Sequence, residues 1–298
     1  MQTKMTLTLV ALAWLATQTA VAQDGRLTIS ELMYEPPTGE AEYVELFNPT
    51  DSTIQLAAYQ IARVLHDSLT TRYPLPQHAV APHGYVCLTG NASSVASCYK
   101  IVDPTAIVEC HLPTYPNSGG SVALCLADST LVERFDYSPQ QHSRLMRSRK
   151  GVSLERRSMS RPVSEPGNWF SAASTAGYGT PGYANSQSSE YLTEESAFTL
   201  NTTLLSPDGD DRDDLLEIDY TLSLSDLAAH AEIYDRQGYC VRHLLAGELL
   251  GTHGTIVWDG LGDSHTRLPS GRYLLRITLY DTGGTQQVIQ RTLAIVYR

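Results

Sequence analysis

Several features that would narrow the function of this protein are scarce or missing from its sequence. Of 298 residues only 4 are Phe and 3 are Lys, against 17 Tyr and 18 Arg. No HExxH, GxSxG or Walker A motif occurs, so the common signatures of zinc proteases, α/β-hydrolases and nucleotide-binding proteins do not apply. Beyond the first 22 residues no apolar run reaches the roughly 18 residues that a spanning helix needs.

Positive charge is also in short supply. The formal net charge is −11, from 21 Lys and Arg against 32 Asp and Glu, and 42% of the residues are hydrophobic. This composition is typical of a globular chain with a sizeable core, and it excludes a wholly disordered one. A general binder of nucleic acid or of anionic membranes needs a positive field, so we expect no nucleic-acid partner. Because no further apolar run is long enough, we also expect no membrane-spanning segment in the mature chain.

Residues 1–22 have the pattern of a secretory signal peptide. Lys4 supplies the positive start, residues 5–16 (MTLTLVALAWLA) form an apolar stretch, and Ala-Val-Ala at 20–22 is a cleavage site. We therefore expect an exported protein whose mature chain begins at Gln23. The predicted location is the periplasm, the outer-membrane surface or the extracellular space.

Export implies an oxidising compartment, in which cysteines pair. Four of the five cysteines fall within 39 residues, and four cysteines allow three pairings. Our interpretation is one disulfide between Cys98 and Cys110 closing a loop and another between Cys87 and Cys125 joining two strands. Buried free thiols are the alternative, and Cys240 is expected to be an unpaired core residue.

The sequence predicts an all-β fold with two Ig-like β-sandwich domains in tandem after the signal peptide. Helical periodicity is nearly absent, and short apolar or alternating runs bounded by Gly, Pro, Asn and Asp recur. The predicted division is a first domain at 23–186, a polar linker at 187–197 and a second domain at 198–298. Strands are predicted at 27–34, 43–48, 54–61, 84–88, 121–126, 131–137, 152–155, 216–222, 231–234, 255–258, 273–279 and 288–296.

Two groups of motifs in the first half resemble the lamin-tail domain, an Ig-like sandwich, as found in exported bacterial proteins. The first group is residues 29–36 (ISELMYEP) with 42–49 (EYVELFNP). The second is residues 151–156 (GVSLER), Asn168-Trp169 and the Gly-, Thr- and Pro-rich stretch 171–185. Val44 and Leu46 share a strand face that should point into the core, so the motif looks structural, and a catalytic acid pair among Glu31, Glu42 and Glu45 is a minor alternative.

The second half resembles C-terminal Ig-like modules of the flagellar hook-capping type and of Bacteroidetes gliding-associated surface proteins. The ordered motifs are residues 205–210 (LSPDGD), 231–238 (AEIYDRQG), 257–260 (VWDG) and 268–273 (LPSGRY). Gly238 is expected to supply the positive φ of a hairpin turn. The LPxGxY motif also occurs in sorting domains of type IX secretion cargo, so removal of this half as a sorting signal is an alternative.

Residues 208–214 (DGDDRDD) are the one metal-like sequence. Carboxylates of Asp208, Asp210 and Asp214 could surround calcium with oxygen ligands, although the spacing is not that of an EF-hand. A solvated acidic turn is the alternative. Calcium is the one cofactor that we predict.

Positive charge concentrates in one stretch, which predicts a basic binding patch for a phosphate or glycan, with a solvated face as the alternative. Its members are Arg144, Arg147, Arg149, Lys150, Arg156 and Arg157.

Together these features predict an exported, non-enzymatic binding or scaffold protein of the bacterial envelope or surface, recognising a protein or glycan partner. Two alternatives remain open. One is a type IX secretion cargo, and the other is an envelope hydrolase using the acidic cluster.

Overall fold

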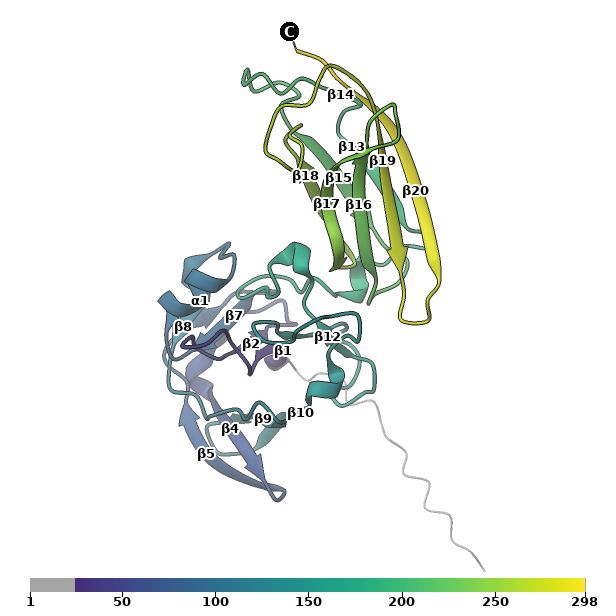
Figure 1. Cartoon of the computed structure of the whole chain (residues 1–298). Coiled ribbons are helices and arrows are strands. Elements are labelled where there is room, and N and C mark those ends of the chain that lie inside the picture. Colours follow the sequence, from purple (N-terminus) through teal and green to yellow (C-terminus); the bar gives the residue numbers. More distant parts are fainter. Residues whose placement is uncertain (1–24, 298) are drawn as a thin grey trace, which may run out of the picture.

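The computed structural model describes residues 25–297, so the predicted signal peptide, its cleavage site and Gln23 lie outside the described residues. The chain forms two sandwiches, one in each half of the sequence, each around its own hydrophobic core (Figure 1). The predicted all-β class is confirmed. Within residues 25–297 no helix is long and apolar enough to cross a membrane.

The first sandwich packs a six-stranded sheet, in the order β12-β11-β1-β2-β7-β8, against a four-stranded sheet, in the order β10-β9-β4-β5. Its elements are β1 (Thr28–Met33), β2 (Tyr43–Phe47), β3 (Ile54–Gln55), η1 (Leu56–Ala58), β4 (Tyr59–Leu65), β5 (Ser68–Pro74), β6 (Ala79–Val80), β7 (Tyr85–Thr89), α1 (Ala92–Cys98), η2 (Pro104–Ala106), β8 (Ile107–Glu109), β9 (Gly120–Leu126), β10 (Leu131–Tyr137), η3 (Pro139–Gln141), β11 (Leu154–Arg156), β12 (Trp169–Ser171) and η4 (Ser174–Ala176).

Strict alternation along the strands separates the core of this sandwich from its outer faces. Val44 and Leu46 on β2 point into the core between the sheets, as predicted, and Glu45 points away from it. Trp169 stacks on Phe135 across the same core, with ring centroids 3.6 Å apart. The outer face of the six-stranded sheet is not open to water, because residues 172–187 and α1 cover it.

The second sandwich packs a three-stranded sheet, β13-β15-β18, against a five-stranded one, β14-β20-β19-β16-β17. Gly238 turns the β16–β17 hairpin with φ of 87°, as expected. The elements are η5 (Ser189–Tyr191), β13 (Ala197–Leu200), β14 (Leu204–Leu205), β15 (Leu216–Thr221), β16 (Ala228–Tyr234), β17 (Cys240–Leu249), β18 (His253–Trp258), β19 (Gly271–Tyr280) and β20 (Gln286–Ile295).

The segment predicted as a polar linker is held tightly at the junction of the two sandwiches. Gln187 is fully buried and donates through its side chain to the Leu250 carbonyl at 3.0 Å. The ring of Tyr191 lies 4.0 Å from the ring of His253, centroid to centroid. These contacts fix the end of the first sandwich against the β17–β18 turn.

The structure forms neither predicted disulfide, since all five cysteines are free thiols. Cys87 and Cys125 lie on different sheets and on opposite outer faces. Cys87 packs with Met33 and Tyr43 under α1, whereas Cys125 packs with Ala62 on the far side of the four-stranded sheet. The core lies between them, so the predicted pairing of these two was wrong. Both cysteines do lie on strands, as predicted, but the local pattern contains no signal that their two strands belong to different sheets.

Candidate functional sites

Three glutamates form a row across adjacent strands on the outer face of the six-stranded sheet. Glu31 on β1 lies opposite Glu45 on β2 and opposite Glu155 on β11. All three side chains are completely buried. Like charges directly opposite one another destabilise a sheet, and burial adds a large cost for each ionised carboxylate. This row therefore requires either protonation or a dense set of hydrogen-bond donors.

The donors come largely from residues 178–187, which we call the strap and which crosses over the row. The Thr180 hydroxyl lies 3.0 Å from Glu31 and 2.9 Å from Glu155, so it donates to one of these carboxyls and accepts from the other when that one is protonated. Gly182 N–H donates to Glu45 at 2.7 Å. The remaining hydrogen bonds to the row are donated by Ser30, Tyr43, Ser153, Ser186, the backbone N–H of Thr180 and the backbone N–H of Gln187.

Burial raises the pKa of each carboxyl in this row. The pKa of Glu155 rises to about 8, chiefly through burial and then through the neighbouring Glu31. Burial also raises the pKa of Glu31 and, further, that of Glu45, against hydrogen bonds that lower both values. The row therefore holds protons near neutral pH, in the way that closely spaced carboxyls share them.

The glutamate row is an internal polar layer, and each of its side chains is sealed from solvent by the strap. In the motif that includes Glu31 and Glu45, the predicted core positions of Val44 and Leu46 are confirmed, and both glutamates are buried on the opposite face. Sequence reasoning missed Glu155 as their partner, although it stands in the GVSLER motif. Glu42 lies apart from the row, and burial raises its pKa to about 7.

The predicted basic patch is only partly a surface. Arg144, Arg147, Arg149 and Lys150 are exposed, and Arg149 pairs with Glu35 at 2.8 Å. Lys150 donates a hydrogen bond to the Thr38 hydroxyl. Arg157 is half-buried, and its guanidinium lies 5.0 Å from the centre of the Phe170 ring.

Arg156 was wrongly included in the patch, because its side chain is 1% exposed. Its guanidinium pairs with Glu133 at 2.8 Å and donates to the Thr28 hydroxyl and the Ile29 carbonyl. It therefore links β11 to β10 and β1 inside the sandwich. A charge run in the sequence does not show this, because Arg156 on β11 projects to the core side while Glu155 projects outward.

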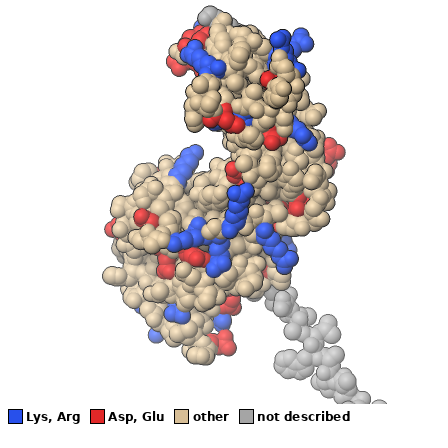
Figure 2. All heavy atoms as spheres, viewed as in Figure 1, with Lys and Arg blue, Asp and Glu red and all other residues tan. Residues whose placement is uncertain are grey.

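An open groove of about 670 Å³ runs beside the exposed arginines. It is lined by Phe135 and Asp136 of β10, by residues 140–144 and 163–167, by Trp169 and Phe170 after them, and by Asp226 and Thr282 of the second sandwich. A smaller adjoining hollow is lined by Arg144, Arg147 and Arg149. Figure 2 shows Lys and Arg side chains gathered on the lower half of this view, below the second sandwich.

His142 is the one imidazole in the wall of this groove among its lining residues. It is buried, its Nδ1 lies 2.8 Å from the Ser171 hydroxyl, and burial lowers its pKa to about 4. The ring is therefore neutral at physiological pH and adds no positive charge. Arg144 is the one arginine that lines the groove, beside the carboxylates of Asp136, Glu165 and Asp226, whereas the adjoining hollow is lined by three arginines.

The acidic loop at 208–214 brings Asp208, Asp210 and Asp214 together, with one oxygen from each within 4.8 Å of the others. The loop also uses these carboxylates itself. Asp214 accepts from the backbone N–H groups of Gly209 and Asp211, both at 2.7 Å, and these bonds lower its pKa. The three residues are convergent, as calcium binding requires, but the loop also stabilises its own turn.

A protein-family model described as Lamin Tail Domain matches residues 20–139. That stretch runs from before β1 to the start of the η3 turn, so it includes Glu31 and Glu45 but not Glu155 or the strap. No curated protein sequence matches the chain.

Solved structures with similar folds share little sequence with this chain. Dimeric latent PorU from Porphyromonas gingivalis is 12% identical with a TM-score of 0.29, over 93% of this chain and 21% of PorU. PorZ, a surface component of the type IX secretion system of the same organism, is 11% identical with a TM-score of 0.25, over 90% of this chain and 39% of PorZ. FlgD from P. aeruginosa is 19% identical with a TM-score of 0.25, over 35% of this chain and 76% of FlgD. With TM-scores below 0.5, these similarities carry no function to this chain.

Proposed function

We propose that this chain is an exported, non-enzymatic binding or scaffold protein of the bacterial envelope or surface. Its partner is a protein or glycan that presents negative charge to the groove beside Arg144 and Arg147. The hollow that adjoins the groove is the single observation that carries this proposal, because it combines a concave surface with the exposed guanidinium groups of Arg144, Arg147 and Arg149 in an otherwise acidic chain. Guanidinium forks suit carboxylate, sulfate and phosphate groups.

The surroundings of the groove support a preorganised binding surface. Beneath it Trp169 stacks on Phe135, and its indole N–H donates to the Val163 carbonyl at 2.8 Å, so one wall is anchored to the core. Pairing of Arg156 with Glu133 braces the same region. A rigid site loses less entropy on binding than a mobile one.

A non-enzymatic role is supported by the state of the glutamate row. Its three carboxyl groups accept hydrogen bonds from the chain itself and are sealed from solvent. A general acid or base has to reach its substrate within hydrogen-bonding distance. The row therefore serves the sandwich rather than a reaction.

Retention on two immobilised anions tests the proposal. The mature chain is applied at low salt to a heparin column, as a sulfated glycan, and to a poly-glutamate column, as an acidic polypeptide. We expect retention on at least one, and we expect the Arg144→Glu/Arg147→Glu variant to elute at markedly lower salt, because exposed ion pairs are lost.

The matched control carries the same charge change elsewhere, as Arg236→Glu/Arg272→Glu on exposed positions of the second sandwich. It should elute like the unaltered chain. If both variants elute at equally lowered salt, the effect comes from net charge alone, and the groove is not the binding site. Failure of the unaltered chain to bind either column would overturn the proposal itself.

A further inference from the structure

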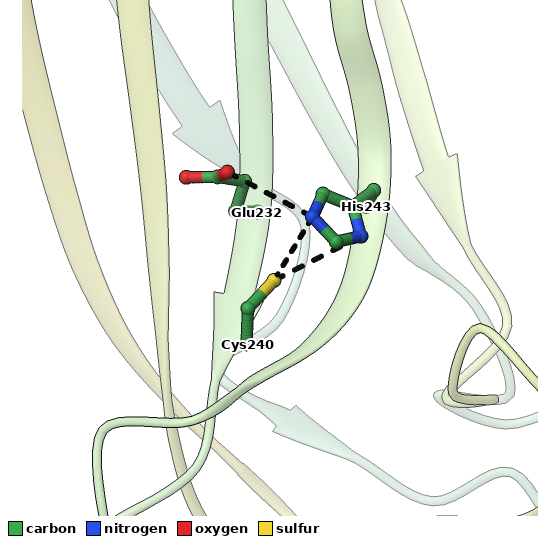
Figure 3. Close-up of side chains that lie close together, drawn as sticks. All are labelled: Glu232, Cys240 and His243. Atoms are coloured by element: carbon green, nitrogen blue, oxygen red, sulfur yellow. Dashed lines mark hydrogen bonds and ion pairs between the residues drawn. The ribbon is translucent and has the colours of Figure 1, made fainter.

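A second cluster of chemistry-bearing side chains lies on the β16–β17 hairpin of the second sandwich. Glu232 on β16 is the register partner of His243 on β17, and Cys240 stands at the start of β17. The side chains of all three converge (Figure 3). One ligand atom from each lies within 4.8 Å of the others. Cys240 is a free thiol, as expected, but it is half-buried beside these polar groups rather than in the core.

Asp263, from the loop after β18, fixes the orientation of His243. One of its carboxylate oxygens accepts the backbone N–H of His243 at 2.9 Å, and the other lies 2.6 Å from Nδ1. An ionised carboxylate can only accept a hydrogen bond, so the ring proton resides on Nδ1. In the neutral imidazole Nε2 then carries the lone pair, on the side of Cys240 and Glu232. A carboxylate bonded to the far nitrogen is the usual support of a metal-binding histidine.

Glu232 is oriented in the same way. The Tyr234 hydroxyl donates to its Oε2 at 2.7 Å, which leaves Oε1 facing His243 at 4.0 Å from Nε2. Three side chains on two strands are thus held with a nitrogen lone pair, a carboxylate oxygen and a sulfur directed at one point. Neighbours of the cluster hold two of the three in place.

One of the distances between ligand atoms already matches that of a tetrahedral site. Bonds of about 2.3 Å to sulfur and about 2.05 Å to nitrogen give a sulfur-to-nitrogen separation of about 3.6 Å, and Cys240 Sγ lies 3.6 Å from His243 Nε2. Sγ also lies 4.0 Å from Nδ1, so the Cys240 side chain has to rotate towards the Nε2 lone pair. Glu232 has to approach as well. Both residues are partly exposed to solvent.

The charges favour a cation over a nucleophilic cysteine. A thiolate at Cys240 would stand beside the carboxylates of Glu232 and Asp263, which oppose its formation. A divalent ion reverses this, because it compensates the carboxylate of Glu232 and the thiolate together. Sulfur, imidazole and carboxylate form a ligand set that zinc accepts.

We propose that Cys240 Sγ, His243 Nε2 and Glu232 Oε1 form a binding site for a zinc-type divalent ion, with Asp263 as a positioning residue. Three protein ligands leave a fourth position for water or a partner's side chain. The ion would fasten β16 to β17 next to the turn that joins them. This site is independent of the groove in the first sandwich.

Cobalt(II) serves as the probe, because thiolate ligation produces a charge-transfer absorption that carboxylate ligation lacks. The reduced mature chain is titrated with cobalt(II) and then with zinc(II). We expect one equivalent to bind with that absorption and zinc(II) to displace it. Cys240→Ser should abolish the band, and Asp263→Asn should keep it while weakening affinity by roughly 10–100-fold, as loss of such a supporting carboxylate does.

Cys98→Ser is the matched control, since Cys98 is another half-buried free thiol and lies far along the chain on α1. It should leave the titration unchanged. Asp210→Asn tests whether the acidic loop contributes to the cobalt(II) signal, and it should also leave the titration unchanged. No thiolate band in the unaltered chain, or a band that persists in Cys240→Ser, would overturn the proposal. Circular dichroism of each variant confirms that it is folded.

Discussion

The carbonyl oxygen of Ser186 accepts hydrogen bonds from both the backbone N–H and the hydroxyl of Thr252, at 2.8 and 3.2 Å. Ser186 also donates its hydroxyl to Glu155 at 2.8 Å. One residue therefore joins the glutamate row of the first sandwich to the β17–β18 turn of the second. The two sandwiches are therefore joined by specific hydrogen bonds as well as by the chain that connects them.

Because of this junction, we expect the mature protein from its native host to keep both halves. The intact mass should correspond to residues 23–298, recovered from the envelope fraction. A chain that ends near residue 195 and is found at the surface or in the medium would instead favour the type IX cargo hypothesis. Deletion of residues 268–298 is the companion test, because only a sorting signal predicts that the truncated chain stays in the periplasm.

The glutamate row predicts a stability that falls as the pH rises. Each carboxyl has a raised pKa in the folded state, so between its unfolded value near 4.5 and its folded value the folded chain binds more protons than the unfolded chain. The free energy of unfolding should then be highest near pH 5 and decline towards pH 8, by about 1.4 kcal/mol per pH unit for each proton involved. Urea unfolding at a series of pH values measures this decline.

Glu45→Gln isolates one proton of that decline. The glutamine oxygen can accept from Gly182 N–H, and its amide can donate to the Ser30 hydroxyl, so the hydrogen bonds of the protonated acid are retained. We expect a slope that is flatter by about one proton. Asp210→Asn, at an exposed carboxylate, is the control. A slope unchanged by Glu45→Gln would contradict protonation of the row.

Arg156 and Arg144 should respond differently to the same substitution. Arg156→Ala leaves Glu133 buried without its cation, and breaking a buried pair costs about 3–5 kcal/mol of unfolding free energy. Arg144→Ala removes an exposed side chain and should change that free energy by less than about 0.5 kcal/mol. Urea midpoints at one pH compare the two. Similar losses of unfolding free energy would contradict the division of the basic stretch into a buried Arg156 that stabilises the fold and an exposed Arg144 that does not.

Calcium binding at the acidic loop is tested by calorimetry and by melting with and without EDTA. We expect weak binding, with a dissociation constant on the order of 10⁻⁴–10⁻³ M, because Asp214 already accepts two backbone N–H groups. Asp208→Asn/Asp210→Asn should remove the heat of binding. No heat, together with a melting temperature unaffected by EDTA, would leave the loop as a solvated acidic turn.

Alternation of apolar and polar residues predicted the strands well, but it did not predict which segments pack over the outer faces of the sheets. In β9, Val122 and Leu124 face the core while Ala123 and Cys125 face away, as the pattern predicts. The sequence analysis did not identify α1, since it is short and lies in a stretch without a clear pattern. Pairing Glu31 with Glu155 depends on strand register across 124 residues, which no local signal contains. The same is true of the approach of Asp263 to His243.

The strand order also shows how much chain is needed to complete the first sandwich. β11 and β12 come late in the sequence, yet β11 lies directly beside β1, and the strap then closes over both. A fragment ending at residue 139, where the family match stops, would leave β1 as a bare sheet edge and expose Glu31 and Glu45 to water. The part of the chain that completes this sheet and covers its glutamates therefore extends to Gln187.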